Sequence, residues 1–196
     1  MSVPLFPLNT VLFPGCTLDL QIFEARYLDM IGQCMKQGEC FGVVCLLKGE
    51  EVGNAPGDYA QIGCEARIVD FQQQDNGLLG IRVKGERRFQ IRSSEVQRNH
   101  LIMAEVSWLE ESPDSPLEED DEDLLALLLA LAEHPMVAAL DMAHGAAGRQ
   151  ELANQLGYLL PFTEDEKLEL LELGDPDARL AAIQLLLDQL QGELFA

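Results

Sequence analysis

The strongest constraint on this sequence is the uneven division of charge along the chain. The net charge at pH 7 is −21 over 196 residues. Residues 1–109 hold 10 lysines and arginines against 13 aspartates and glutamates, whereas residues 110–196 hold 3 against 21. A step from −3 to −18 between the two stretches predicts two structural units. The acidic second unit should repel nucleic acid and anionic membranes, an objection that the nearly neutral first unit does not share.

The boundary between these units is predicted at residues 111–123. Serines and prolines alternate there with acids, and six consecutive acids, Glu118 to Asp123, follow. We therefore expect a first domain at residues 1–110, an acidic Ser/Pro linker and helix start at 111–123, and a helical domain at 124–196. The acidic run lacks the alternating oxygen ligands and the glycine of a calcium loop. Acids at a helix N-terminus interact favourably with the helix dipole, and this is the interpretation that we prefer.

The first unit has the pattern of a β-rich domain with one helix. Apolar residues recur at three- and four-residue steps from Phe23 to Gln37, which predicts a helix that Gly38 ends. The turn Asp75-Asn76-Gly77 predicts a hairpin, because Asn-Gly tolerates positive φ values. Six or seven strands with close turns predict a closed or semi-closed barrel. The clearest strands are residues 3–8, 17–22, 40–47, 62–71, 79–91 and 101–108.

The second unit has the pattern of helices throughout. Two capping boxes are predicted, one at Ser115–Glu118 and one at Thr163–Glu166. Asp175-Pro176 is expected to open the last helix, which Gly192 should end. Shorter helices are expected near residues 137–144 and 150–159. These helices together predict an α-helical bundle.

The sequence lacks the common signatures of catalysis and metal binding. It has no GxxxxGK[ST], GxGxxG, HExxH, CxxC or Gly-x-Ser-x-Gly. Its five cysteines are expected to be buried, reduced thiols. No apolar run reaches the ~18 residues of a membrane helix, and the N-terminus has no signal-peptide pattern. We expect a cytoplasmic protein that is not an enzyme, with no catalytic residue, cofactor, metal site or membrane association.

Several motifs in the first unit resemble one known family. Pro4 to Gly15 reads PLFPLNTVLFPG, and Leu18 to Tyr27 reads LDLQIFEARY. Together they resemble the opening of the N-terminal domain of Lon proteases. The family pattern Gly-x-x-Arg-Phe is matched at Gly85 to Phe89, and residues 155–190 resemble the helical subdomain that follows.

The resemblance implies an α+β architecture: a PUA-like β-barrel of six or seven strands and one helix, followed by an α-helical bundle. It implies a stand-alone copy of this domain without the ATPase and Ser–Lys protease modules of full Lon. It also implies a role in binding unfolded or client polypeptides, with a protease or chaperone as a further partner. The family's Glu24 and Arg26 positions are interpreted as a structural pair that anchors the helix.

Two surfaces are candidates for binding. Leu12, Phe13 and Pro14 form an apolar, proline-broken segment that can accept an extended peptide; the alternative is that Phe13 plugs the end of the barrel. The basic residues Lys84, Arg87, Arg88 and Arg92 can contact RNA in an alternative, RNA-binding function; the competing interpretation is a solvated strand face. Net charge weighs against nucleic acid as a partner.

Overall fold

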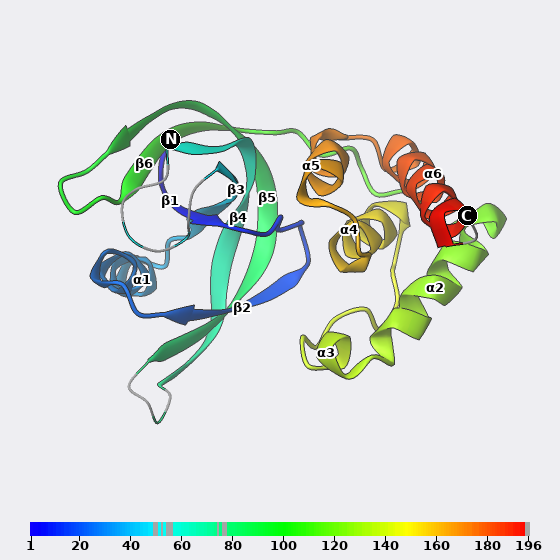
Figure 1. Cartoon of the computed structure of the whole chain (residues 1–196), viewed down its shortest axis with the longest axis horizontal. Helices are drawn as coiled ribbons and strands as arrows, with labels where there is room; N and C mark the ends of the chain where they lie inside the picture. The colour runs from blue at the N-terminus through cyan, green and yellow to red at the C-terminus, as the bar shows by residue number, and fades with distance from the viewer. Residues whose placement is uncertain (49–50, 52, 54–56, 74, 76–77, 195–196) are drawn as a thin grey trace. The chain divides into compact units, whose positions relative to one another are not determined.

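The alternating apolar residues of the first half form strands in the computed structural model. The structure describes all residues except 49–50, 52, 54–56, 74, 76–77 and 195–196. The side chains of residues 193 and 194 are not described either. The chain divides into two units, Met1–Leu109 and Glu110–Ala196 (Figure 1). The first carries the strands and one helix, and the second is helical. The architecture is α+β, as predicted.

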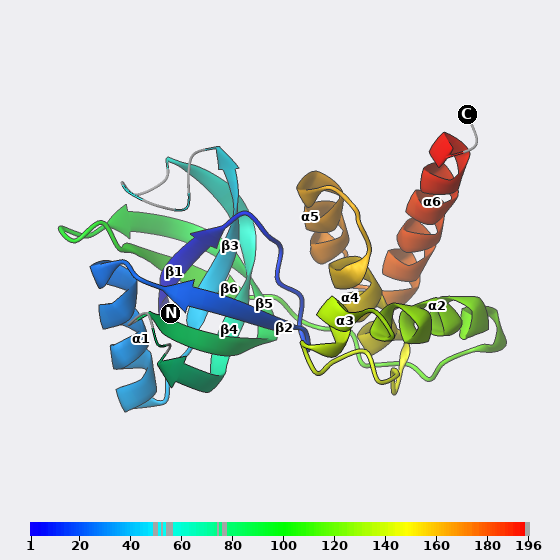
Figure 2. The same cartoon turned by 60° about the horizontal axis from the view of Figure 1, so that its bottom comes forward.

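Within the described residues, six strands of the first unit pair in the order β2-β5-β4-β3-β1-β6, and β5 also pairs with β6. Five of these strands therefore pair in a closed ring, whereas β2 pairs, among the described strands, with β5 (Figures 1 and 2). The pairing of β1 with β3 is parallel and the others are antiparallel. The strands are β1 (Ser2–Leu8), β2 (Thr17–Ile22), β3 (Phe41–Lys48), β4 (Asp58–Gln73), β5 (Leu79–Val96) and β6 (Ile102–Trp108).

The predicted strands are all present, but β4 and β5 are longer than their alternating patterns. They form one hairpin in which Gln73 pairs with Leu79. Of the predicted turn, residues 76 and 77 lie outside the described residues. The packing of Phe89 depends on glycines of β3 and β4: a Cβ at Gly42 or Gly63 would lie 2.7 or 2.6 Å from its ring. Phe89 is fully buried in the space that these two glycines leave.

Helix α1 (Ala25–Gln37) ends as the sequence predicts. Gly38 has a φ of 68°, and its N–H donates to the carbonyl of Cys34. The start differs from the prediction: Glu24 is extended and acts as the N-cap. Phe23 therefore precedes the helix and does not share its buried face; 54% of its surface is exposed.

In the described part of the second unit, a 3₁₀ turn at Glu119–Asp121 is the first helical element, and five α-helices follow it. Helix α4 contacts α2, α5 and α6. The leucines that α4 buries, Leu152 and Leu156, are fully enclosed. The helices are α2 (Glu122–Ala132), α3 (Pro135–Ala138), α4 (Arg149–Leu159), α5 (Glu164–Glu172) and α6 (Pro176–Leu194). The helix expected near residues 137–144 is thus a single turn that starts earlier.

A buried arginine links three of these helices. Arg179 of α6 donates from Nε to the carbonyl of Leu170 at 2.9 Å, and it also donates to the carbonyl of Leu173 and to Asn154 Oδ1. Carbonyls at a helix C-terminus have no partner within the helix. Arg179 supplies hydrogen bonds to two such groups at the end of α5 and a cation close to the negative end of its dipole.

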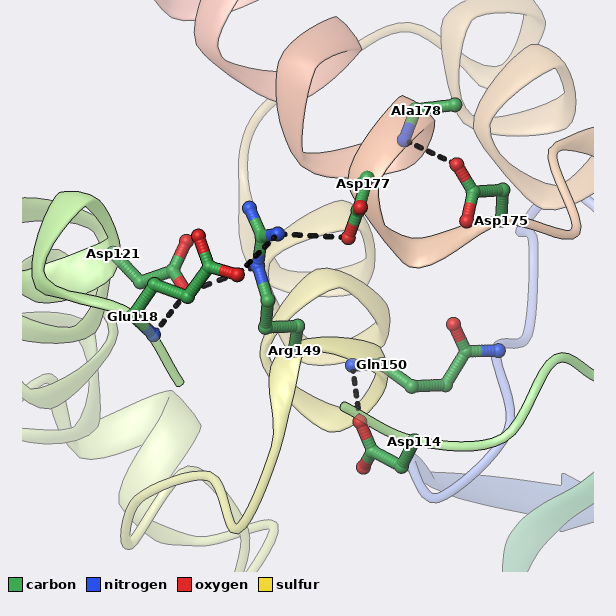
Figure 3. Close-up of polar contacts among 8 residues, drawn as sticks. All are labelled: Asp114, Glu118, Asp121, Arg149, Gln150, Asp175, Asp177 and Ala178. Carbon is green, nitrogen blue, oxygen red and sulfur yellow. Dashed lines mark hydrogen bonds and ion pairs between the residues drawn. The ribbon is translucent and has the colours of Figure 1, made fainter. Parts of the chain in front are cut away.

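Residues 111–123, expected to form a linker, make specific contacts within the second unit (Figure 3). Asp114 Oδ1 accepts a hydrogen bond from the N–H of Gln150 at 2.8 Å, and the carbonyl of Ser115 accepts one from the N–H of Arg149 at 2.8 Å. The free N–H groups at the start of α4 are thus satisfied by a distant segment. Gly148 permits this approach, because a Cβ there would lie 2.4 Å from Asp114 Oδ1.

Two acids of the run, Glu118 and Asp121, and Asp177 of α6 lie close to the side chain of Arg149 (Figure 3). Arg149 Nε lies 3.0 Å from Asp121 Oδ2, an ion pair rather than an aligned hydrogen bond, and Nη1 lies 2.7 Å from Asp177 Oδ1. Glu118 Oε1 lies 3.7 Å from Nη1. Asp121 is 3% exposed. At least one acid of the run is therefore buried and paired rather than solvated.

The two predicted capping boxes have different outcomes. The box at Thr163 is confirmed, with Thr163 Oγ1 accepting from the N–H of Glu166 and Glu166 accepting from the N–H of Thr163. The box predicted at Ser115 is wrong. The box forms instead at Glu118 with Asp121, because Ser115 lies in the segment that contacts α4.

This difference predicts unequal effects of two similar substitutions. Thr163→Ala should lower the free energy of unfolding of the second unit by about 1 kcal/mol, the usual cost of a lost N-cap. Ser115→Ala, the matched control, should change it much less, because Ser115 Oγ has no hydrogen-bond partner among the described residues. Urea denaturation followed by circular dichroism measures both. Equal destabilisation by the two substitutions would contradict this assignment.

Candidate functional site

The segment Leu12, Phe13 and Pro14 does not form the apolar binding surface that the sequence suggested. Leu12 and Phe13 are buried, and Phe13 has no exposed area; Pro14 is half-buried. The backbone is held against β5, since Gly15 N–H donates to the carbonyl of Gly85 and Gly85 N–H donates to the carbonyl of Cys16. A side chain without exposed area cannot contact a peptide. The structure thus places Phe13 in the core of the first unit.

The basic cluster on β5 is dispersed by a bulge. The register shifts between the pairs Cys64–Arg88 and Ala66–Gly85, so two residues of β5, Glu86 and Arg87, lie opposite Glu65 of β4. The bulge puts Arg88, 1% exposed, beside the buried Phe89. The expected exposed face carrying Arg88 and Arg92 is therefore wrong for Arg88. Arg92 is exposed and donates to Ser107 Oγ, and Lys84 is exposed.

The fourth residue of that cluster, Arg87, is also engaged within the protein. Its guanidinium donates twice to the carboxylate of Glu65, at 2.9 and 3.3 Å, and lies 3.8 Å above the ring of Trp108. The hydrogen bond to Glu65 is the main reason that the pKa of Arg87 is raised. Binding a phosphate at this site would compete with a bidentate carboxylate. The structure therefore does not provide the continuous basic surface expected of an RNA-binding face.

A groove beside β2 is a better candidate. It has a volume of about 240 Å³ and lies where β1, β2, the start of α1 and Glu51 converge. This volume is below the range of about 300–1,000 Å³ typical of drug-sized ligands. A short segment of polypeptide suits it better than an enclosed small molecule. Its lining residues are Phe6, Leu8, Asp19, Leu20, Gln21, Ile22, Phe23, Glu24, Tyr27 and Glu51.

Aromatic rings form one wall of this groove. Phe6 stacks on Tyr27 with ring centroids 4.0 Å apart, and Phe6 also contacts Phe41 at 6.1 Å. Burial raises the pKa of Tyr27 to about 12, opposed by the nearby Arg26 and assisted by Glu24 and Glu51. Tyr27 therefore stays a neutral phenol at physiological pH. The half-exposed ring of Phe23 completes an apolar surface at the groove.

The predicted pair of Glu24 and Arg26 is present at the rim. Arg26 Nη2 lies 3.0 Å from Glu24 Oε2. Arg26 Nη1 donates to the carbonyl of His100 at 3.1 Å, and the guanidinium lies 4.7 Å from the ring centre of Tyr27. The nearly buried Arg26 thus ties the first turn of α1 to the connection between β5 and β6. This agrees with its interpretation as an anchor for the helix.

A second, more open hollow lies on β2, β4 and β5, with a volume of about 520 Å³. It shares Asp19, Leu20 and Gln21 with the groove. Leu20, Ile81 and Phe71 are paired across the three strands and so lie on one face. On the opposite face, Arg82 donates twice to Asp19, at 2.7 and 2.8 Å. Exposed Phe71 adds a large apolar side chain to this region of the first unit.

Sequence reasoning missed the groove because its lining comes from three separated parts of the chain, residues 6–8, 19–27 and Glu51. The local signal was ambiguous: Phe23 fits a helical apolar face as well as a residue that precedes the helix. The only available clue was the placement of Phe23 and Glu24 directly between a strand and a helix start.

The described residues contain no group of three or more His, Cys, Asp or Glu placed to hold a metal. Burial, the largest effect, raises the pKa of Cys34 to about 11, which disfavours its thiolate at neutral pH. Of the helices in the described part of the chain, none has the length and apolarity needed to cross a membrane.

The comparisons with known proteins agree with the fold. The crystal structure of a Lon N-terminal domain protein from Xanthomonas campestris has a TM-score of 0.75 and 36% identity, and covers 95% of this chain and 97% of that chain. The N-terminal domain of Lon protease from the Mycobacterium avium complex has a TM-score of 0.61 and 23% identity, covering 93% and 96%. These structures define the class: an α+β domain with the Lon N-terminal fold.

The family model for the ATP-dependent protease La (LON) substrate-binding domain matches residues 2–189. The chain belongs to this family, as its opening motifs predict. Lon protease from Flavobacterium johnsoniae is 28% identical over 134 residues, 68% of this chain, and Lon protease from Anaeromyxobacter dehalogenans is 23% identical over 95% of it. The aligned region spans 16% and 23% of those two relatives.

Proposed function

We propose that this chain is a non-catalytic polypeptide-binding or adaptor module that recognises unfolded or client polypeptides, with a protease or chaperone as a further partner. It acts in the cytoplasm. A PUA-like β-barrel at residues 1–110 carries the binding site, residues 111–123 join it to the second domain, and residues 124–196 form a helical bundle. Membership of a substrate-binding domain family supports this function.

One observation carries the proposal: an apolar groove with an exposed aromatic residue lies beside β2, the end strand of the described sheet. Phe23 at its rim is half-exposed, although burying a large aromatic ring is favourable. Such grooves are a recurrent site for extended peptides. The RNA-binding alternative has no comparable support, because Arg87 and Arg88 are engaged or buried.

Replacement of Phe23 tests the site directly. Phe23→Asp should reduce capture of a denatured, reduced and alkylated polypeptide by about tenfold or more, the effect of losing 1.4 kcal/mol or more of apolar contact. The melting temperature of the Phe23→Asp variant should stay close to that of the wild type, because the ring of Phe23 is half-exposed. Fluorescence anisotropy of a labelled denatured polypeptide measures binding, and circular dichroism measures melting.

Val96→Asp is the matched control. Val96 is similarly exposed, at 56%, lies in the same unit at the end of β5, and does not line the groove. It should bind as the wild type does. If Phe23→Asp melts normally and still captures the polypeptide with wild-type affinity, the groove is not the binding site.

A further inference from the structure

We propose that the groove binds an extended peptide, which adds as a strand beside β2. We further propose that it prefers peptides in which large apolar side chains alternate with lysine or arginine. This inference rests on the proposed function, because it specifies how a polypeptide occupies the same groove.

The position of the groove along β2 supports strand addition. Asp19, Leu20, Gln21 and Ile22 all line it, although successive residues of a strand point to opposite faces. The other described lining residues come from β1, the start of α1 and Glu51, and none of them belongs to β5, so the groove lies on the side of β2 away from its ladder partner. β2 is the end strand of the sheet and pairs with β5 in the ladder. The edge opposite β5 is the place where an added strand would form its ladder.

The aromatic wall explains the apolar part of the preference. A peptide strand beside β2 projects every second side chain to the same face. On one face it meets Phe23, Tyr27 and the ring of Phe6 that stacks on Tyr27. A phenylalanine or leucine there would be removed from water mainly against the exposed ring of Phe23, because Tyr27 and Phe6 are only 4% and 6% exposed.

The charged lining explains the basic part of the preference. Asp19, Glu24 and Glu51 line the groove, and none of the lining residues that the structure describes is a lysine or arginine. Two nearby cations face these acids: Arg82 pairs with Asp19, and Arg26 pairs with Glu24. Glu51 accepts a hydrogen bond from the N–H of Asn9, which leaves its negative charge in place. The lining therefore favours a cationic side chain over an anionic one.

The charge of the whole protein selects the same occupant. At −21, the chain repels a second copy of itself and other acidic chains, and it attracts basic segments at low ionic strength. Pairing of β2 with the β2 of another molecule would also bring the two Asp19 side chains close to one another. A basic and apolar segment of another polypeptide is thus favoured over self-association.

Synthetic peptides test both parts of the inference. The parent is a fluorescein-labelled peptide of alternating phenylalanine or valine and lysine, and its charge partner has glutamate at every lysine. The parent should bind about tenfold more tightly at low salt, and the difference should narrow as added salt screens the charges. Glu51→Gln should weaken the parent by a larger factor than it weakens a peptide with serine at each lysine position, because only the parent loses a charge pair.

Backbone methylation tests strand addition itself. Two isomers of the parent carry N-methyl groups on alternate residues, one on the odd set and one on the even set, so that each blocks a different edge. The isomer whose methyl groups face β2 should bind about tenfold more weakly, because two or more ladder hydrogen bonds are lost. The parent peptide should compete with the denatured polypeptide, and the Phe23→Asp variant should not bind it. These two results together would locate peptide binding in the groove.

The outcomes separate the inference from the proposed function. If both methylated isomers bind like the parent, or if the glutamate peptide binds as tightly as the lysine peptide, the inference is overturned, while Phe23-dependent capture of denatured polypeptide keeps the proposed function. If Phe23→Asp captures both peptide and denatured polypeptide normally, the proposed function of the groove is contradicted, and the inference that rests on it is contradicted as well. Loss of binding with one isomer, together with the lysine preference, supports the inference.

Discussion

Replacing Arg149 with methionine should destabilise the second unit by about 3 kcal/mol or more, the usual cost of removing one partner from a largely buried ion pair. The reason is Asp121, which is enclosed and has its carboxylate 3.0 Å from Arg149 Nε. Without the guanidinium, a buried negative charge loses its cation close to the negative charges of Glu118 and Asp177. Thermal unfolding followed by circular dichroism should show a lower midpoint.

Two further variants distinguish this cause from a simple loss of packing. Asp177→Asn removes a carboxylate that is 63% exposed in its side chain and should have a much smaller effect, because solvent screens that pair. Arg149→Met combined with Asp121→Asn should recover much of the lost stability, since the buried charge is then absent. Failure of this rescue would show that the charge of Asp121 is not the cause.

Arg149→Met should also make residues 111–123 more susceptible to proteolysis. Their serines, prolines and acids predicted a linker, but Asp114 and the carbonyl of Ser115 hold the segment to the start of α4. A protease needs an extended, accessible backbone. The wild type should resist cleavage there, and Arg149→Met should be cut sooner at the same sites.

Local sequence features predicted the element positions well because their causes are local. Gly38 ends α1 through its own left-handed conformation, and Thr163 begins α5 through a hydrogen bond to a residue three positions away. The alternation in β2 gave its bounds, Thr17–Ile22, without error. Each of these signals is contained in a few neighbouring residues.

The features that were predicted wrongly, or not predicted, depend on contacts between residues far apart in the sequence. The side chain of Arg88 is buried because a bulge in β5 changes the alternation of its strand. Ser115 does not cap a helix, because its backbone satisfies the start of α4. The groove beside β2 is the clearest case: its aromatic wall pairs Phe6 with Tyr27, two residues that no local pattern connects.

Phe13→Asp should unfold the first unit, in contrast to Phe23→Asp. Phe13 has no exposed surface, and replacing a buried phenylalanine with a small side chain already costs about 3–5 kcal/mol. An unpaired carboxylate in the same place adds a desolvation penalty of several kcal/mol. The sum is comparable to the whole stability of a domain, about 5–15 kcal/mol. Gel filtration and circular dichroism should show an aggregated or unfolded first unit.

The comparison with Phe23→Asp makes this result informative about function as well as stability. Both substitutions place a carboxylate at an aromatic position of the same unit, but only Phe23 is exposed. Phe13→Leu is the gentler test, because leucine keeps most of the apolar volume and should retain the fold. It should also retain peptide capture, since residue 13 does not line the groove. A folded Phe13→Leu that loses capture would place the binding surface at residues 12–14 after all, as the proline-broken apolar segment first suggested.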